Sequence, residues 1–328
     1  MIIHPDLRAL RSDDAPQRDA QEALFAVVGA WRKRPHVAAI LADLERFAGT
    51  GALSDCPSLA ALFDEGAAHA DELAAGFARE VSACLEREPL GHVPLRHFTD
   101  GTVSTLLLAR SGNVTLSLVA LDGEGLAARP DPVTVDFSPS EVRERVLAGT
   151  ARAERIERLS ADEAHAELTR EQVGLSPGRV IARDALREAL LVRRVDGCLV
   201  TLRLQRRRTG AGPTCEYRIA DGKLVHQAAG NPRDSRVELM MALLGRMGRS
   251  DAVPMLAEIA LEPGSTALRW QALRECLALD TGRGFAALTE VARSECDELA
   301  RPAGAFRSQL VESYPQLLEI AACPAHSI

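Results

Sequence analysis

The spacing of the apolar residues changes twice along this chain, and this limits its possible folds more than any other feature. Up to about Pro89 they recur every three or four positions, from about Gly91 they alternate, and in the last third the wider spacing returns. The first spacing is that of an amphipathic helix and the second that of a half-buried strand. The sequence therefore predicts an α+β chain of three parts, with an N-terminal helical region over residues 1–95, an antiparallel β-rich domain over 96–230 and a helical region over 231–328.

Three amphipathic helices are predicted in the N-terminal region. Leu24 and Trp31 share one face of the first, Pro35 interrupts the ladder, and the second helix ends near Gly49. The third covers Asp71–Glu86. Apolar stripes of this kind are typical of helices packed on a core, so they indicate structure and no chemistry.

The central region reads as about seven antiparallel strands joined by hairpins, which suits a β sandwich or a jelly-roll barrel. Small residues and Asp-Gly pairs at 111–113, 196–197 and 221–222 supply three of the turns. Val114–Leu118 matches Val200–Leu204 at four positions of five, which leaves open an internal duplication. The predicted strands are Thr102–Arg110, Val114–Leu121, Pro132–Phe137, Glu188–Arg194, Cys198–Arg206, Thr214–Ala220 and Lys223–Ala228.

Two short helices are expected between these strands. Ser138-Pro139-Ser140-Glu141 has the pattern of a capping box with proline at the first helical position, which predicts a helix to about Leu147. A second helix is predicted over Ala161–Glu171.

The C-terminal region predicts four short helices whose separating segments each contain a glycine and a capping side chain. They cover Val237–Met247, Ala252–Leu261, Thr266–Leu279 and Phe285–Val291. Residues 236–292 resemble HEAT-like repeats of the phycobilisome-lyase type at 242–245, 252–256 and 268–273. The resemblance implies stacked α-hairpins that offer a surface to a protein partner or to the neighbouring domain, with Trp270 as a candidate contact residue.

The central strands also resemble, weakly, a cupin-like barrel, on strand count and on the turn Leu175-Ser176-Pro177-Gly178. Such a barrel could hold a divalent metal such as iron, zinc or manganese between histidines and a carboxylate. The chain lacks the histidine-x-histidine pair and later glutamate usual in that family. The alternative interpretation of the histidines is that they are hydrogen-bonded turn or sheet residues. The candidate ligands are His92, His97, Asp100 and His226.

Arginines are concentrated in the second half of the β-rich region. Residues 181–220 contain nine arginines against four carboxylates, although the whole chain has a net charge of −7. Arg203 and Arg207 share one strand face, opposite Leu202 and Leu204. Together with Arg218 they could bind an anionic ligand or an acidic protein surface. The alternative is a solvated sheet face, paired across strands with Glu188 or Glu216.

Composition and motifs narrow the function classes. The acidic net charge and an aromatic content of 4% disfavour nucleic acid as a partner. No phosphate loop, dinucleotide fingerprint or Gly-x-Ser-x-Gly elbow is present. The charged start of the chain and a longest early apolar run of nine residues, Ala23–Trp31, predict a cytoplasmic protein without a membrane span. The seven dispersed cysteines are expected to be reduced thiols.

These observations favour a non-enzymatic binding or regulatory protein that needs no cofactor. Its helical stack would bind a protein partner, and its β domain would bind a small ligand or a second copy of the chain. The alternative is a metal-dependent cupin-like enzyme that uses the histidines named above.

Overall fold

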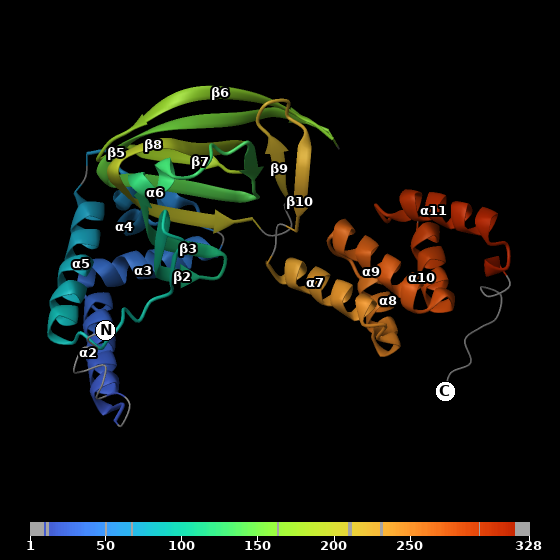
Figure 1. Ribbon diagram of the computed structural model, residues 1–328, viewed down its shortest axis with the longest axis horizontal. Coiled ribbons are helices and arrows are strands. Elements are labelled where there is room, and N and C mark those ends of the chain that lie inside the picture. Colours follow the sequence, from blue (N-terminus) through green and yellow to red (C-terminus); the bar gives the residue numbers. More distant parts are fainter. Residues whose placement is uncertain are drawn as a thin grey trace. The chain divides into compact units, whose positions relative to one another are not determined.

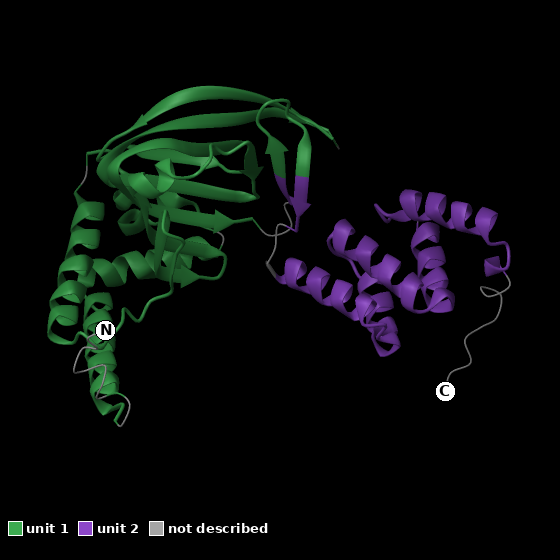
Figure 2. Ribbon diagram, in the orientation of Figure 1, with its two compact units in different colours: residues 1–208, 216–225 green, residues 209–215, 226–328 purple. Residues whose placement is uncertain are grey.

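The computed structural model describes residue 10 and residues 13–49, 51–66, 68–162, 164–208, 212–229, 232–294 and 296–318. The chain divides into two compact units (Figures 1 and 2). The first contains residues 1–208 and 216–225, and the second contains residues 209–215 and 226–328. The order of elements, helices followed by an antiparallel sheet and further helices, confirms the predicted α+β class.

The N-terminal helices form where the apolar stripes predict them. Proline occupies the first turn of both α2 and α3, where its missing N–H has no cost. Trp31 packs edge-on against Phe77 with 5.0 Å between ring centroids, which joins the first helix to the last. The elements are α2 (Ala15–Arg32), α3 (Pro35–Ala48), η1 (Leu53–Asp55), α4 (Pro57–Ala60), η2 (Ala61–Phe63) and α5 (His69–Arg87).

Seven strands form one antiparallel sheet in the order β1-β2-β3-β8-β5-β6, with β7 paired to the first part of β5. In Figure 1 the long strands β5 and β6 arch together along one edge of this sheet. A second sheet has the order β10-β9-β4, and the short helix α6 (Gly123–Ala127) follows β3. The strands are β1 (His97–Thr99), β2 (Val103–Ser111), β3 (Val114–Asp122), β4 (Thr134–Phe137), β5 (Ser140–Ala161), β6 (Ala166–Leu175), β7 (Val180–Asp184), β8 (Glu188–Arg207), β9 (Thr214–Arg218) and β10 (Leu224–Ala228).

The two faces of the large sheet carry separate cores. Leu116, Leu202 and Leu204 point to the N-terminal helices and share one buried cluster with them. The helical region and the sheet, predicted as separate regions, thus share a hydrophobic core. On the opposite face Val146 and Leu199 belong to a second, smaller apolar cluster. Alternation along β8 therefore directs Thr201 and Arg203 away from the helices, as the sequence pattern indicates.

The two helices predicted inside the β region are wrong. Ser140 begins the 22-residue strand β5, and Ala166–Leu175 is strand β6. The first stretch is rich in glutamate and arginine, which favour a helix locally. In the sheet, Glu141 and Glu144 lie opposite Arg206 and Arg203 of β8, and that pairing outweighs the local preference.

The hairpin predicted at Asp196-Gly197 is also wrong, because β8 continues through it. Three residues of β8 lie opposite Gly149 of β5 at this point, so the ladder is bulged. Gly197 has φ +75° and Gly149 has φ +83°, and a Cβ on Gly149 would lie 2.0 Å from the carbonyl oxygen of Cys198. Residues 190–204 therefore do not form a second hairpin like the one around residues 111–113. The two similar segments are instead neighbours, with Leu116 opposite Leu204.

The second unit contains the C-terminal helices, and all four predicted ones are present. Ser265 and Asp280 cap α9 and α10 by accepting bonds from the backbone N–H groups of Leu268 and Arg283. A fifth helix, α11, was not predicted, and the relation to HEAT-like repeats stays a prediction. The helices are α7 (Pro232–Arg246), α8 (Val253–Leu261) after the short η3 (Ser250–Ala252), α9 (Thr266–Leu279), α10 (Thr281–Arg293) and α11 (Ala300–Ser313).

The expectations about membrane spans and about cysteines can be compared with the described residues. No helix among the described residues is long and apolar enough to cross a membrane. Six of the seven cysteines lie in the described part of the chain, where all six are free thiols, and Cys323 lies outside it.

Candidate functional site

A hollow of about 240 Å³ opens on the face of the large sheet that points away from the N-terminal helices. Strands β4, β5, β7 and β8 supply its lining, which includes Ser140, Arg183, Glu188, Arg203 and Gln205. We call it the sheet hollow. The predicted ligand residue Arg203 thus belongs to a concave, polar site.

One carboxylate and two guanidinium groups form the charged centre of this site. Arg203 donates from Nε to Oε1 of Glu144 at 2.7 Å, and its Nη2 lies 2.6 Å from the same oxygen. Arg183 donates from Nη1 to the other oxygen, Oε2. Glu144 lies directly across the ladder from Arg203, so the sheet register sets this pairing. The side chains of Glu144 and Arg183 are 8% and 12% exposed, whereas that of Arg203 is 35% exposed.

The two arginines determine the protonation state of Glu144. Burial alone would raise its pKa, but the charges of Arg203 and Arg183 and their hydrogen bonds outweigh burial, so the pKa lies below its ordinary value. The group stays a carboxylate at neutral pH. A general acid or base works best with a pKa near the working pH, so Glu144 is suited to hold the arginines and not to transfer protons.

Polar and apolar surfaces meet at Arg203. Gln205, the next residue on the same strand face, donates to the hydroxyl of Ser140 at 3.2 Å. A smaller hollow of about 40 Å³ adjoins the sheet hollow, and Arg203 and Leu190 line both of them. Its remaining lining is mostly aliphatic: Val119, Leu121, Val146, Leu175, Ile181, Val192 and Leu199.

Five of the nine concentrated arginines pair with three carboxylates of β5. Arg206 pairs with Glu141 at 2.7 Å, and Arg193 pairs with Glu154 at 2.6 Å. The predicted partner Glu188 binds Arg155 instead. Glu141 and Glu144 were missed because β5 was predicted to begin as a helix, and Glu154 because no strand was predicted over residues 148–160. The signal that could have found them is the period of two in residues 140–146, where valines at 142 and 146 share a face with position 144.

The other predicted arginines lie apart from this centre. Arg207 is exposed near the end of β8, and Arg218 pairs with Asp221 at the β9–β10 turn at 3.0 Å. Neither lines the sheet hollow. Trp270, predicted to contact a partner, is half-buried and packs on Phe306 with ring centroids 5.7 Å apart. The tryptophan therefore supports the core of the helical unit.

The three predicted metal ligands of the first unit, His92, His97 and Asp100, do not assemble there. Nowhere in the described ranges do three or more His, Cys, Asp or Glu side chains form a group that could hold a metal ion. His92 and His97 line a shallow surface hollow, where the ring of His97 bonds the backbone oxygen of Leu95. Asp100 instead accepts backbone N–H bonds from Thr102 and Val103 and pairs with Arg129. His226 is an exposed residue of β10.

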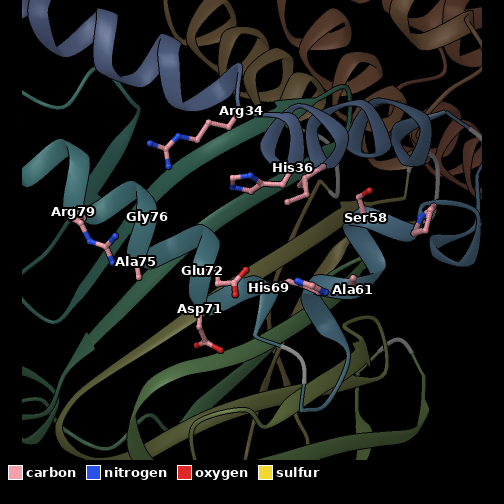
Figure 3. A pocket seen from close by; sticks show the side chains of 12 residues that line it. Arg34, His36, Ser58, Ala61, His69, Asp71, Glu72, Ala75, Gly76 and Arg79 are labelled. Atoms are coloured by element: carbon pink, nitrogen blue, oxygen red, sulfur yellow. The ribbon is translucent and has the colours of Figure 1, made fainter.

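A larger groove of about 800 Å³ lies among the N-terminal helices α3, α4 and α5 (Figure 3). In Figure 3, Arg34 and Arg79 lie toward one end and Ser58 and His69 toward the other. Arg34 is paired with Glu80, which does not line the groove. The charged side chains are spread along its length and do not converge, so we place the candidate site in the sheet hollow.

No family model and no curated protein matches this chain. It is similar to several solved structures. These include a cupin superfamily protein from Desulfitobacterium hafniense DCB-2, with 17% identity over 34% of this chain and 83% of that chain at a TM-score of 0.22. HutD from Pseudomonas fluorescens SBW25 shows 16% identity over 35% of this chain and 57% of its own, with a TM-score of 0.24. KdgF from Halomonas sp. shows 16% identity over 34% and 89%, with a TM-score of 0.23. Likenesses of this extent assign no function.

Proposed function

We propose that this chain is a binding protein whose β region takes up a small anionic ligand, such as a short carboxylate, in the sheet hollow. The observation that carries the proposal is the two-to-one ratio of guanidinium to carboxylate at Arg183, Glu144 and Arg203. Two positive charges share one negative charge, so the centre keeps an excess positive charge.

The donors of the two arginines are only partly used. Within the described residues, Arg203 engages Glu144 through Nε and Nη2, and Arg183 engages it through Nη1. The remaining N–H groups are available to a ligand carboxylate or phosphate, which guanidinium groups bind in a planar, two-pronged geometry. Asp136 and Glu188 also line the hollow, and both are already engaged, Glu188 with Arg155.

The size of the hollow limits the ligand. Sites for drug-sized molecules usually measure about 300–1,000 Å³, so 240 Å³ suits an anion of a few carbon atoms. The adjoining aliphatic hollow would accommodate little more than a methyl group. We therefore propose a short carboxylate of a few carbon atoms.

The binding hypothesis is favoured over the metal-dependent alternative. Three of the residues predicted to hold a metal, His92, His97 and Asp100, form no metal-binding group in the described part of the first unit, and the buried carboxylate of the site is engaged by two arginines. The protein partner predicted for the C-terminal helices belongs to the same proposal of a binding protein, and it does not depend on the sheet hollow.

The test is calorimetric titration of the full chain with succinate, acetate and inorganic phosphate. We expect at least one of these anions to bind, and Arg203→Gln to weaken its binding tenfold or more, about 1.4 kcal/mol. Arg207→Gln is the matched control, since it removes an equal charge from the same strand face outside the hollow. Equal losses in the two variants, or no binding of any of these anions to the unaltered chain, would contradict the proposal.

A further inference from the structure

Four large apolar side chains lie exposed along helix α7 and just after its end. Leu239, Met240, Leu243 and Met247 are 72%, 60%, 56% and 59% exposed. Their spacing of three and four residues places them on one side of the helix. We call them the α7 stripe.

The opposite side of α7 is already buried. Met241 is 2% exposed and lies in the core of the helical unit, where Val237 also packs. The helix is therefore apolar on both sides, which is typical of a helix covered on both sides. Four such side chains expose on the order of 400 Å² of apolar surface, the size at which a patch usually marks an interaction site.

We propose that the α7 stripe is the contact surface for a second copy of this chain, with the two α7 helices antiparallel across a two-fold axis at Leu243. The two ends of the stripe are symmetric about this residue, because Leu239 precedes it by four positions and Met247 follows it by four. A two-fold axis there places Leu239 of each copy against Met247 of the other. One self-complementary contact thus buries the stripe of both chains.

The position of Arg246 beside the stripe is compatible with this pairing. Arg246 follows Leu243 by three positions, so it lies across from Met240 of the second copy and not from another arginine. Its aliphatic stem can cover the methionine while the guanidinium reaches water. Methionine side chains adapt their shape to the opposing surface, which eases packing between identical helices.

The area predicts how strong the dimer is. The two stripes together bury on the order of 800 Å², and the residues around them add to this area. Stable interfaces bury about 1,200–2,000 Å². We therefore expect a reversible dimer that forms in the micromolar range and dissociates on dilution.

The test is sedimentation velocity of the full chain across a concentration series from about 1 to 200 µM, a span that brackets micromolar affinity. The unaltered chain should shift with concentration from its monomer mass of 35.3 kDa toward twice that value. Leu243→Glu should remain monomeric throughout, because it places two carboxylates on the axis. Met255→Glu is the matched control: this methionine of α8 is 65% exposed and outside the stripe, so the dimer should persist.

A cross-link tests the position of the axis. Leu243→Cys should form a covalent dimer on mild oxidation, identified by mass mapping of the 243–243 peptide, and Met255→Cys should not form the corresponding 255–255 bond. A chain that stays monomeric across the series, or a dimer that survives Leu243→Glu, overturns the proposal. Neither outcome bears on anion binding, because no residue of the sheet hollow is changed.

Discussion

Two buried arginine-carboxylate groups, one in each unit, differ in how completely their hydrogen bonds are used. In the helical unit, Arg269 donates from Nε to the backbone oxygen of Ala260, and from Nη1 and Nη2 to the two oxygens of Asp297. All three of its nitrogens are engaged. In the sheet, Glu144 is shared between Arg183 and Arg203, whose donors are engaged only in part.

The difference separates a structural contact from a binding site. The charges of Arg269 and Asp297 cancel, and their side chains are 8% and 13% exposed. Through these contacts Arg269 connects the start of α9 with the end of α8 and with the turn before α11. The Glu144 group has one surplus positive charge beside a hollow. A buried pair whose nitrogens are all engaged has none left for a ligand, whereas a pair that is engaged only in part can also donate to one.

The largest effect is expected from Asp297→Ala. The change leaves Arg269 buried without its charge partner, so the helical unit should lose about 3–5 kcal/mol of unfolding free energy. Urea denaturation followed by circular dichroism measures this. Asp251→Ala, which breaks the exposed pair with Arg249, is the control and should leave the unfolding free energy almost unchanged. Similar losses of unfolding free energy in the two variants would show that the buried pair does not stabilise the helical unit as we describe.

A smaller loss of stability is expected from Glu144→Gln, together with a gain in anion binding. The amide leaves two guanidinium groups without a counter-charge, and because Arg203 is partly exposed the cost should be nearer about 2 kcal/mol. Because the variant removes a negative charge from the site, it should tighten the binding of phosphate or succinate in the titration described above. Asp297→Ala should not change anion affinity. If Glu144→Gln weakened anion binding, the surplus-charge explanation of the hollow would be wrong.

The smallest effect concerns acid pH. The pKa of Glu144 is lowered in the folded protein, so its contribution to stability is complete above the unfolded value of about 4.3. That contribution is lost as the pH falls through the lower folded-state pKa. Between about pH 5 and 3, the unfolding free energy of the unaltered chain should therefore fall more steeply than that of Glu144→Gln. Parallel slopes in denaturation curves across this range would contradict the assignment.

The sequence predicted well wherever local pattern and tertiary packing agree. The hairpin at 111–113 and helix α9 lie where periodicity and capping place them, and Arg203 lies on the expected face of β8. Prediction failed in β5, because residues there alternate between sheet faces while carrying charged side chains that mask the alternation. Glu144 faces the interior only because Arg203 and Arg183 arrive from strands distant in sequence, and a local pattern contains no trace of that meeting.

The bulge at Gly149 has a consequence for recognising relatives of this chain. An ion pair across two strands can be reversed, with arginine and glutamate exchanged, and the fold keeps its energy balance. Position 149 permits no such exchange, because any side chain would collide with the backbone of Cys198 and the residue must adopt a positive φ. A glycine at this point, between a charged half-strand and a second half-strand of similar length, is therefore a more durable signature of descent than the site residues themselves.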